Sequence, residues 1–332
     1  MKSKLGKERM NSKKYDLKQN HISEALSAYL DDLDFKIQHP NDINGLSTGI
    51  KNLDVHLNGI RPGQVILVGG RPAMGKTWFA VNLAYNMAIT LSKENTSNKQ
   101  CVLYFNMESN PKLLSERFIA VSADMSTYDL RNETYNTEEF TKVANAVRLL
   151  EKLPIYISKK GYDIDSIRQE IIKINSSISI GCIFIDYLQL MDRKTSDCSF
   201  IMNQIKELAT SFNIPIIVLS QLTRDVENRL DKHPCVTDVR GFGKNRIIAD
   251  KILLLYREIY YIKYEEPIKK KKETDAHFQK RLEEWTQRCK DVENLCEIWI
   301  GENDDGSCGH VDTYFNPRTG LFKELPDEWD FL

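Results

Sequence analysis

The chain has 332 residues, of which 41% are hydrophobic and 28% are charged, and its formal net charge is -1. These values are typical of a globular protein with one large domain or two small ones. They exclude a polycation, so any binding of nucleic acid must use a local basic surface. No apolar run approaches the roughly 20 residues that cross a bilayer, and the seven scattered cysteines form no C-x-x-C pair. We therefore expect a cytoplasmic protein with reduced thiols and no membrane partner.

Two N-terminal segments precede the first apolar strand pattern. Residues 1–19 are polar and lysine-rich, which predicts a disordered tail; a phosphate-touching arm is the alternative. Residues 20–40 predict an amphipathic helix, because apolar side chains recur at helical spacing on one face. These side chains are Ile22, Ala25, Leu26, Tyr29, Leu30 and Leu33. The helix could fold back on its own domain or dock on a neighbouring subunit.

Six short apolar runs between about residues 41 and 325 predict buried strands, with helical stretches between most of them. They are QVILVGG, CVLYFNM, LPIYIS, GCIFIDYLQLM, IPIIVLSQL and DKILLLYR. Buried strands that alternate with helices predict an α/β domain with a mostly parallel central sheet flanked by helices. The helix after the first strand is expected to reach about Ile89.

Residues 262–294 interrupt this alternation. The run KKKK at 269–272 leads into a stretch in which Phe278, Leu282, Trp285 and Val292 share one helical face, which predicts an inserted amphipathic helix. We interpret the lysine run as a solvated face, with a nucleic-acid contact as the alternative. Two strand-like segments, EIWIG and GHVDTYFN, flank ENDDGSC and predict a terminal hairpin. We expect residues 326–332 to form a C-terminal tail.

The segment GRPAMGKT at 70–77 fits the pattern G-x-x-x-x-G-K-[ST] and stands between a predicted strand and a predicted helix. Glycines let backbone N–H groups curl around phosphate oxygens, and the helix N-terminus adds favourable partial charge. Lys76 should reach the outer phosphates, and the Thr77 hydroxyl should ligate magnesium. A glycine-rich turn without a ligand is the alternative, and it leaves Lys76 without a role. The predicted ATP-binding residues are Gly70, Arg71, Pro72, Ala73, Met74, Gly75, Lys76 and Thr77.

Three polar side chains at predicted strand ends could complete a hydrolytic site. Asp186 could hold Mg²⁺, Glu108 could act as the base or orient the water, and Gln221 could sense the γ-phosphate. The carboxyl ends of parallel strands meet at one edge of the sheet, where ligands bind. The alternatives are a helix-capping or strand-end aspartate, a surface glutamate and a solvent-facing glutamine.

Five motifs occur in a fixed order between about Leu46 and Phe322: GRPAMGKT, MES, FIDYLQLM, IPIIVLSQLTR and ENRLDKHP. Together they resemble the C-terminal motor domain of the DnaB-type replicative helicases, a RecA-like family. The resemblance implies a RecA-like P-loop NTPase core preceded by a linker-like helix. It also implies a ring, usually a hexamer, that holds ATP·Mg²⁺ between subunits and moves on single-stranded DNA. The inserted helix is similar to one that some bacterial members carry.

The resemblance assigns roles residue by residue. Lys76 and Thr77 would hold phosphate and magnesium, and Asp186 would support the metal. Glu108 would polarise the attacking water, and Gln221 would couple the γ-phosphate to the DNA loops. Arg240, Gly243 and Lys244 in DVRGFGK fall where the central loop of the family contacts the DNA backbone. An ordinary polar turn is the alternative there. The helix near 22–33 would match the linker helix that docks on the next subunit.

The sequence also departs from the family pattern. The residues ahead of the linker-like helix are too few for the family's N-terminal helical domain, and the segment after Asp192 is short. Glu302 and Asp304 stand where the family usually places a lysine and an arginine that reach the neighbour's γ-phosphate. Carboxylates there would repel the phosphates. The alternatives are that this hairpin points elsewhere, or that Arg246 or Arg318 supplies the cation.

Three hypotheses follow. The first is an ATP-dependent DNA helicase or translocase of the replicative type, active in a ring. The second is an ATP-binding regulatory or interaction paralogue that acts on a full-length replicative helicase and hydrolyses ATP weakly. The third is a RecA-like ATPase of recombination or repair, which IDYLQLM and SQLTR favour less. We prefer the first because family membership usually carries the activity class.

Overall fold

The computed structural model describes residues 22–38, 43–93, 99–108, 110–131, 135–158, 163–191, 198–242 and 247–325. The chain divides into two compact units, Met1–Asn44 and Gly45–Leu332. In the first unit, helix α1 spans Ile22–Gln38, somewhat longer than the apolar pattern at 22–33. Its large apolar side chains are exposed: Ile22, Leu26, Tyr29, Leu30, Leu33 and Ile37.

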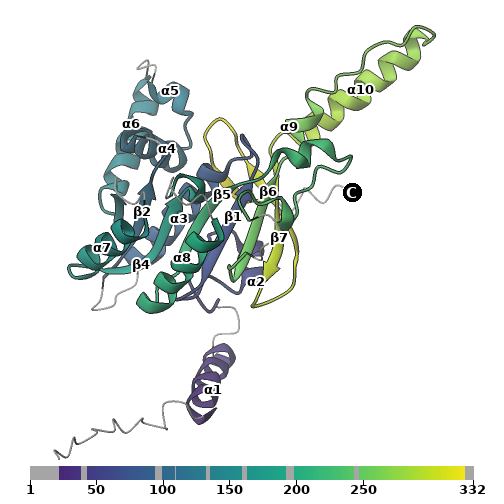
Figure 1. Cartoon of the computed structure of the whole chain (residues 1–332). Coiled ribbons are helices and arrows are strands. Elements are labelled where there is room, and N and C mark those ends of the chain that lie inside the picture. The colour runs from purple at the N-terminus through teal and green to yellow at the C-terminus, as the bar shows by residue number, and fades with distance from the viewer. Residues whose placement is uncertain are drawn as a thin grey trace, which may run out of the picture. The chain divides into compact units, whose positions relative to one another are not determined.

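The second unit is built on a nine-stranded sheet with the order β3-β2-β4-β5-β1-β6-β7-β8-β9 (Figure 1). The first six strands in sequence order are β1 (Val65–Gly70), β2 (Gln100–Asn106), β3 (Ile155–Ser158), β4 (Ser179–Asp186), β5 (Ile216–Gln221) and β6 (Lys251–Tyr256). They pair with one another in parallel. The predicted strands and the mostly parallel α/β fold are therefore confirmed.

Helices cover both faces of the sheet, and this is why the central strands are apolar on both sides. The α-helices between residues 51 and 212 are α2 (Lys51–Leu57), α3 (Lys76–Lys93), α4 (Pro111–Ala123), α5 (Thr127–Arg131), α6 (Thr137–Leu150), α7 (Ile164–Asn175) and α8 (Cys198–Phe212). Successive side chains of a strand point to opposite faces. Ile66 and Val68 of β1 accordingly pack in a core with α3, whereas Val65 and Leu67 pack in a second core with α7 and α8.

The C-terminal strands continue the sheet in antiparallel pairing. β7 (Leu295–Asn303) pairs with β6, and β8 (Gly309–Phe315) pairs with β7, as the hairpin prediction required. β9 (Phe322–Glu324) was not predicted, because three residues carry no readable alternation. Since β7 runs opposite to β6, the turn between β7 and β8 lies at the edge where β1 and β6 begin. The P-loop lies at the other edge, where β1 ends.

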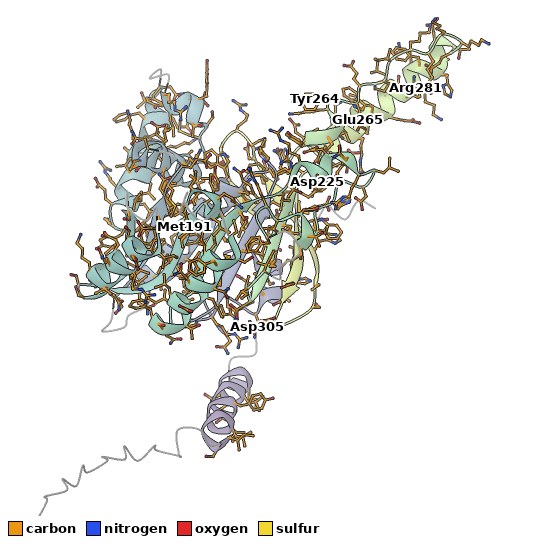
Figure 2. The ribbon with its side chains drawn as sticks, in the orientation of Figure 1. Met191, Asp225, Tyr264, Glu265, Arg281 and Asp305 are labelled. Carbon is orange, nitrogen blue, oxygen red and sulfur yellow. The ribbon has the colours of Figure 1, made fainter. Side chains whose placement is uncertain are left out.

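Residues 262–294 form an arm that projects from the sheet (Figures 1 and 2). Helix α9 (Ile259–Ile262) precedes it, and α10 (Asp275–Asp291) lies within it. Trp285 Nε1 donates to the Ile262 carbonyl at 2.8 Å, and Arg288 pairs with Glu258 at 2.6 Å, so the base of the arm is tied to α9. The lysines at 269–272 are exposed. Among the described helices, none has the length and apolar character needed to cross a membrane.

Candidate nucleotide site

The loop between β1 and α3 is a tight turn with two residues in the left-handed region. Ala73 has φ +65° and Gly75 has φ +94°. Position 75 needs glycine for a second reason, because a Cβ there would lie 3.2 Å from Cζ of Phe315. The Phe79 N–H donates to the Gly75 carbonyl at 2.8 Å, which is the start of the α3 ladder. The predicted strand, loop and helix therefore follow one another in the geometry that a phosphate-binding loop requires.

A cavity of about 330 Å³ opens beside this loop. Five predicted site residues line it together, from the loop and from the ends of β2, β4 and β5: Lys76, Thr77, Glu108, Asp186 and Gln221. Pro72, Ala73 and Gly75 also line it, whereas Gly70 and Arg71 contribute carbonyls to Lys76 and Met74 is buried in the core. These side chains therefore meet at one edge of the sheet, as expected for the carboxyl ends of parallel strands.

A larger cavity, about 1090 Å³, lies along the edge strand β3 and the end of α7. Tyr156, Glu170 and Lys173 line it together with serines and aliphatic side chains. The described residues of its lining include one carboxylate and no glycine-rich loop or helix N-terminus. The smaller cavity is therefore the better candidate for nucleotide chemistry, since size alone brings no convergent phosphate ligands.

Lys76 is held at the mouth of the loop. Its Nζ donates to the Gly70 carbonyl at 2.7 Å and to the Arg71 carbonyl at 3.1 Å. Burial lowers the pKa of Lys76 to about 8, although the charges of Asp186 and Glu108 oppose that shift. An ammonium group has three donors, and two are used here. The third can serve a phosphate, whose negative charge would also raise the pKa of Lys76 again and favour its protonated form.

Asp186 ends β4 inside the cavity. Its Oδ2 accepts a hydrogen bond from the buried Tyr104 hydroxyl at 3.1 Å. Burial, with a contribution from the charge of Glu108, raises the pKa of Asp186 to about 6, and hydrogen bonds from Tyr104 and Thr77 oppose the rise. The Thr77 hydroxyl and the Asp186 carboxylate are hard oxygen donors of the kind that Mg²⁺ prefers. A cation at this place would relieve the repulsion between the two carboxylates.

The comparisons with known proteins agree with this geometry. The model of the DnaB-like helicase C terminal domain matches residues 45–324. The chain belongs to this family. The replicative DNA helicase DnaB of Rickettsia bellii is 29% identical over 340 residues, which cover 97% of this chain and 68% of that protein. The replicative DNA helicase DnaC of Bacillus subtilis is 32% identical over 318 residues, covering 93% and 63%.

Two solved structures of the same kind superpose on the chain. The ATPase domain of G40P has a TM-score of 0.74 and 25% identity, covering 92% of this chain and 99% of that one. A DnaB-like replicative helicase, solved in a study of its interactions with primase, has a TM-score of 0.73 and 26% identity, covering 92% and 67%. The RecA-like core is therefore shown. The chain spans about two thirds of the length of the curated relatives that it matches.

Of the predicted nucleic-acid contact, Arg240 is described, and it does not line the nucleotide cavity. The Arg240 N–H donates to the Gln221 carbonyl at 2.8 Å, and Arg240 Nη1 is 3.5 Å from Gln221 Oε1. Arg240 thus adjoins the residue that was predicted to sense the γ-phosphate. Gly243 and Lys244 lie outside the described residues, as does the segment after Asp192 up to residue 197.

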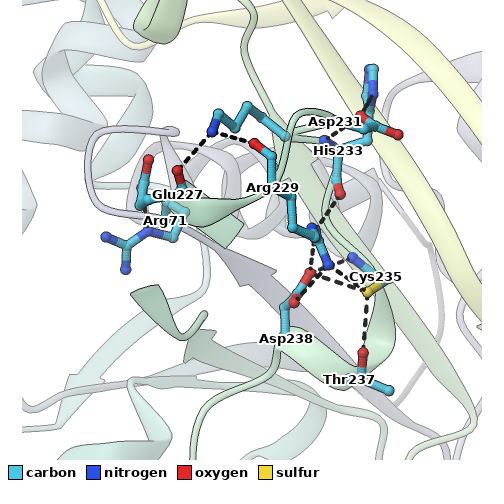
Figure 3. Close-up of polar contacts among 9 residues, drawn as sticks. Arg71, Glu227, Arg229, Asp231, His233, Cys235, Thr237 and Asp238 are labelled. Atoms are coloured by element: carbon cyan, nitrogen blue, oxygen red, sulfur yellow. Dashed lines mark hydrogen bonds and ion pairs between the residues drawn. The ribbon is translucent and has the colours of Figure 1, made fainter. Parts of the chain in front are cut away.

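An ion pair holds the loop from outside. Arg71 Nε donates to Glu227 Oε1 at 2.8 Å, and Arg71 Nη1 donates to the Leu222 carbonyl at 3.0 Å. Figure 3 shows this pair next to the Arg229–Asp238 pair, in which Nη2 and Oδ2 are 2.8 Å apart. The motif ENRLDKHP, which supported the family resemblance, therefore packs beside the P-loop.

Two cations in the cavity lining were missed by sequence reasoning. Arg257 follows β6, and its guanidinium lies 4.7 Å from the centre of the Phe315 ring. The strand-end rule could have found it, since it ends the run DKILLLYR. Arg117 comes from α4 and lies 5.7 Å from the centre of the Trp78 ring. No local signal points to Arg117, because the packing of α4 against α3 decides its position.

The acidic hairpin is the β7–β8 hairpin that carries Glu302 and Asp304. Its turn contacts its own chain at the edge of the sheet opposite the P-loop (Figure 2). Asp305 pairs with Arg61 and, at 2.8 Å, with Lys251, and it accepts from Gln64 Nε2 at 2.6 Å. The Asp304 N–H donates to the Asp250 carbonyl at 3.0 Å. Of the two alternative cations, Arg318 lines a separate cavity of about 300 Å³, and Arg246 lies outside the described residues.

Proposed function

We propose that this chain is an ATP-dependent DNA helicase or translocase of the replicative type. It hydrolyses ATP between the subunits of a ring, and turnover moves the ring along single-stranded DNA. The observation that carries the proposal is the meeting of a P-loop lysine, two carboxylates and a glutamine in one cavity at the carboxyl edge of the sheet. Membership of the DnaB-like helicase family supplies the reaction class.

ATP·Mg²⁺ binding uses the loop and the end of β4. The backbone of residues 70–77 and the start of α3 bind the phosphates, and Lys76 provides a charge next to the outer ones. Thr77 and Asp186 hold the magnesium ion, which when bound neutralises phosphate charge. Their donor chemistry suits that ion, and burial of the Asp186 carboxyl leaves it in need of a cation.

Hydrolysis uses Glu108 and Gln221. Glu108 orients the water and accepts its proton, since it lines the cavity at the end of β2, beside Lys76 and Asp186. Gln221 responds to the γ-phosphate from the end of β5. Arg117 and Arg257 add positive charge to the same cavity from within the chain. Fixed cations stabilise charge that grows in the transition state, which is usually the largest catalytic contribution.

Single-stranded DNA and other subunits are the proposed partners. Arg240 contacts the DNA backbone, together with Gly243 and Lys244 of the following loop. The exposed apolar face of α1 supports assembly with a neighbouring subunit, either another copy of this chain or a full-length replicative helicase. The names of the curated relatives as replicative DNA helicases support DNA as the track.

The experiment is a steady-state ATPase assay with and without an oligothymidylate strand, alongside a mass measurement of the assembly. The proposal expects turnover that requires Mg²⁺, rises with the oligonucleotide and accompanies a ring-sized mass. A protein that binds no ATP analogue in a direct titration would overturn it.

A second candidate function is supported by the acidic hairpin. Glu302 and Asp304 occupy the positions where, by resemblance, cations would reach a neighbour's nucleotide, and Asp305 is engaged with Lys251 and Arg61. Reversing a unit charge at about 4 Å changes the interaction by a few kcal/mol at moderate dielectric. On this hypothesis the homogeneous protein binds ATP but turns it over slowly, and it regulates a full-length helicase by joining its ring.

Two measurements separate these functions. The regulatory candidate expects that mixing with a full-length DnaB-type helicase changes the turnover of the mixture, because the partner supplies the missing cations. It also expects that the double variant Glu302→Lys with Asp304→Arg turns ATP over faster than the natural chain. Brisk DNA-stimulated turnover by the natural chain alone would reject this candidate and favour the first.

A further inference from the structure

Gln189 lies between the nucleotide cavity and Arg240. It belongs to the short 3-10 helix η2 (Leu188–Leu190), which follows Asp186 and the end of β4. Its side-chain Nε2 donates to Ser220 Oγ at 2.8 Å and to the Arg240 carbonyl at 3.0 Å. Its Oε1 accepts from the Gln221 N–H at 3.2 Å. Both sides of one amide group are therefore used, and every partner belongs to another segment.

These hydrogen bonds join three functional segments. η2 continues from the carboxylate that was assigned to magnesium, Ser220 and Gln221 end β5, and Arg240 adjoins the predicted nucleic-acid loop. Gln221 and Arg240 are also joined directly, through backbone and side chain. A shift of Gln221 in the cavity would therefore strain the Gln189 amide, and that amide would transmit the shift to the Arg240 backbone.

The position of Gln189 suits transmission and not chemistry. It is half-buried and does not line the nucleotide cavity, whereas its neighbours Tyr187 and Gln221 do. Ser220 is fully buried, so its hydroxyl cannot exchange Gln189 for water. Removing the two donors of Gln189 would therefore free the Arg240 carbonyl and leave Lys76 and Asp186 with all their contacts.

We propose that Gln189 is a positioning residue that couples occupancy of the nucleotide cavity to the position of Arg240, and hence to the binding of single-stranded nucleic acid. This inference rests on the proposed nucleotide and DNA sites. Coupling between two sites is reciprocal, so it can be measured from either ligand. A tie with only a structural role would affect stability and nucleotide affinity but would leave the coupling intact.

The test uses the full chain and the variant Gln189→Glu, which keeps the shape and the acceptor but loses both donors. Gln189→Ala is the second variant, in case the new carboxylate impairs folding. Gln287→Ala on the arm is the control, since among the described residues its Nε2 donates to Asp291 of the same helix, at 2.7 Å. The affinity for a non-hydrolysable ATP analogue with Mg²⁺ is titrated with and without an oligothymidylate strand, and the ratio of the two dissociation constants is the coupling factor.

For the natural chain we expect a coupling factor in the usual range of about 5 to 150. In Gln189→Glu and Gln189→Ala the factor should fall toward one, while the affinity for the analogue without DNA stays within about twofold. The control should keep the natural factor. A natural factor that both Gln189 variants retain would overturn the inference and leave the proposed function standing. A natural chain that binds both ligands with a factor of one would also overturn it, whereas failure to bind the analogue at all would overturn the proposed function as well.

Discussion

The two edges of the sheet each hold a lysine whose pKa is lowered by burial, and the contrast between them separates a ligand site from a structural one. Burial lowers the pKa of Lys76 and of Lys251 to about 8 in both cases. Lys76 donates to two loop carbonyls and faces a cavity of about 330 Å³. Lys251 is fully buried and has four partners: Leu57 O at 2.8 Å, Gly59 O at 2.8 Å, Gln64 Oε1 at 3.1 Å and Asp305 Oδ2 at 2.8 Å.

The carboxylates differ in the same way. At the amino edge, Asp305 pairs with two cations and Asp250 pairs with Lys206 at 2.7 Å. At the carboxyl edge, burial and then the repulsive charge of Glu108 raise the pKa of Asp186. The paired charges at the amino edge stabilise the fold. The two carboxylates at the carboxyl edge repel each other, and this arrangement suits the binding of a cation and a polyphosphate. The pKa shifts of Lys76 and Lys251 are similar and do not distinguish the two edges, whereas their hydrogen-bond and ion-pair partners do.

The largest effect is expected from the removal of Lys76. Lys76→Ala should abolish detectable ATP binding and lower any turnover by about 10²–10³-fold, the usual effect of losing one fixed donor. The free energy of unfolding should not fall, because the lost contacts are balanced by relief of a buried charge. Calorimetric titration and urea denaturation measure the two quantities. Unchanged affinity for ATP would mean that the cavity is not the nucleotide site.

Removing Lys251 should have the opposite pattern. Lys251→Met should lower the free energy of unfolding by about 3–5 kcal/mol, since one member of a buried ion network is deleted and its partners stay buried. The affinity of the folded protein for ATP should be unchanged. Lys206→Met is the matched control, because this partly exposed lysine of the same edge should cost about 1 kcal/mol or less. A loss of ATP affinity with intact stability would make the two edges functionally equivalent.

The parallel strands, the P-loop and the strand-end residues of the site could be predicted from the sequence, because each has a local pattern. The parallel strands are short apolar runs with helical segments between most of them, and the P-loop is recognised by the spacing of its glycines. Once those strands were assigned, the strand-end rule brought Glu108, Asp186 and Gln221 to one edge without any knowledge of strand order.

Long-range packing explains the rest. Lys251 lay in a run that was read only as a strand, and its partner Asp305 follows 54 residues later (305 − 251), across the whole arm. Arg117 depends on the path of α4. The contacts of the Gln189 amide depend on the register between β4 and β5. The position of the hairpin turn depends on the antiparallel pairing of β6 with β7.

The pH dependence of stability gives a smaller but signed effect. Folded Asp186 keeps its proton up to about pH 6, whereas the unfolded chain releases it near the ordinary aspartate pKa of 3.8. The stability that this group contributes is therefore complete below that value and is lost as the pH rises to about 6, by up to about 3 kcal/mol. Asp186→Asn should remove this component. The free energy of unfolding of the variant minus that of the natural chain should therefore increase from pH 4 to pH 7. A constant difference across urea titrations at these pH values would contradict the raised pKa.

The smallest effect is expected at the loop itself, where Arg71 and Glu227 form the one ion pair described at the P-loop. Their side chains are 13% and 33% exposed, so the pair is intermediate between the saturated network at the amino edge and a surface contact. Glu227→Gln keeps the shape and one acceptor and removes the charge, and it should weaken ATP binding about two- to fivefold, with an unfolding change of about 1 kcal/mol or less.

Salt provides the internal check on that pair. Raising the NaCl concentration from 0.05 to 0.5 M should bring the ATP affinity of the natural chain toward that of Glu227→Gln, because a partly exposed pair is screened. Glu138→Gln on α6 is the control, since Glu138 and Lys142 form an ion pair in which both side chains are more than half exposed (78% and 54%). Salt also weakens the direct attraction of ATP, so the informative quantity is the ratio of the two dissociation constants at each salt concentration. A ratio that does not shrink with salt would mean that Glu227 acts on the loop through packing and not through its charge, and the carboxyl edge would then be held in place by shape alone.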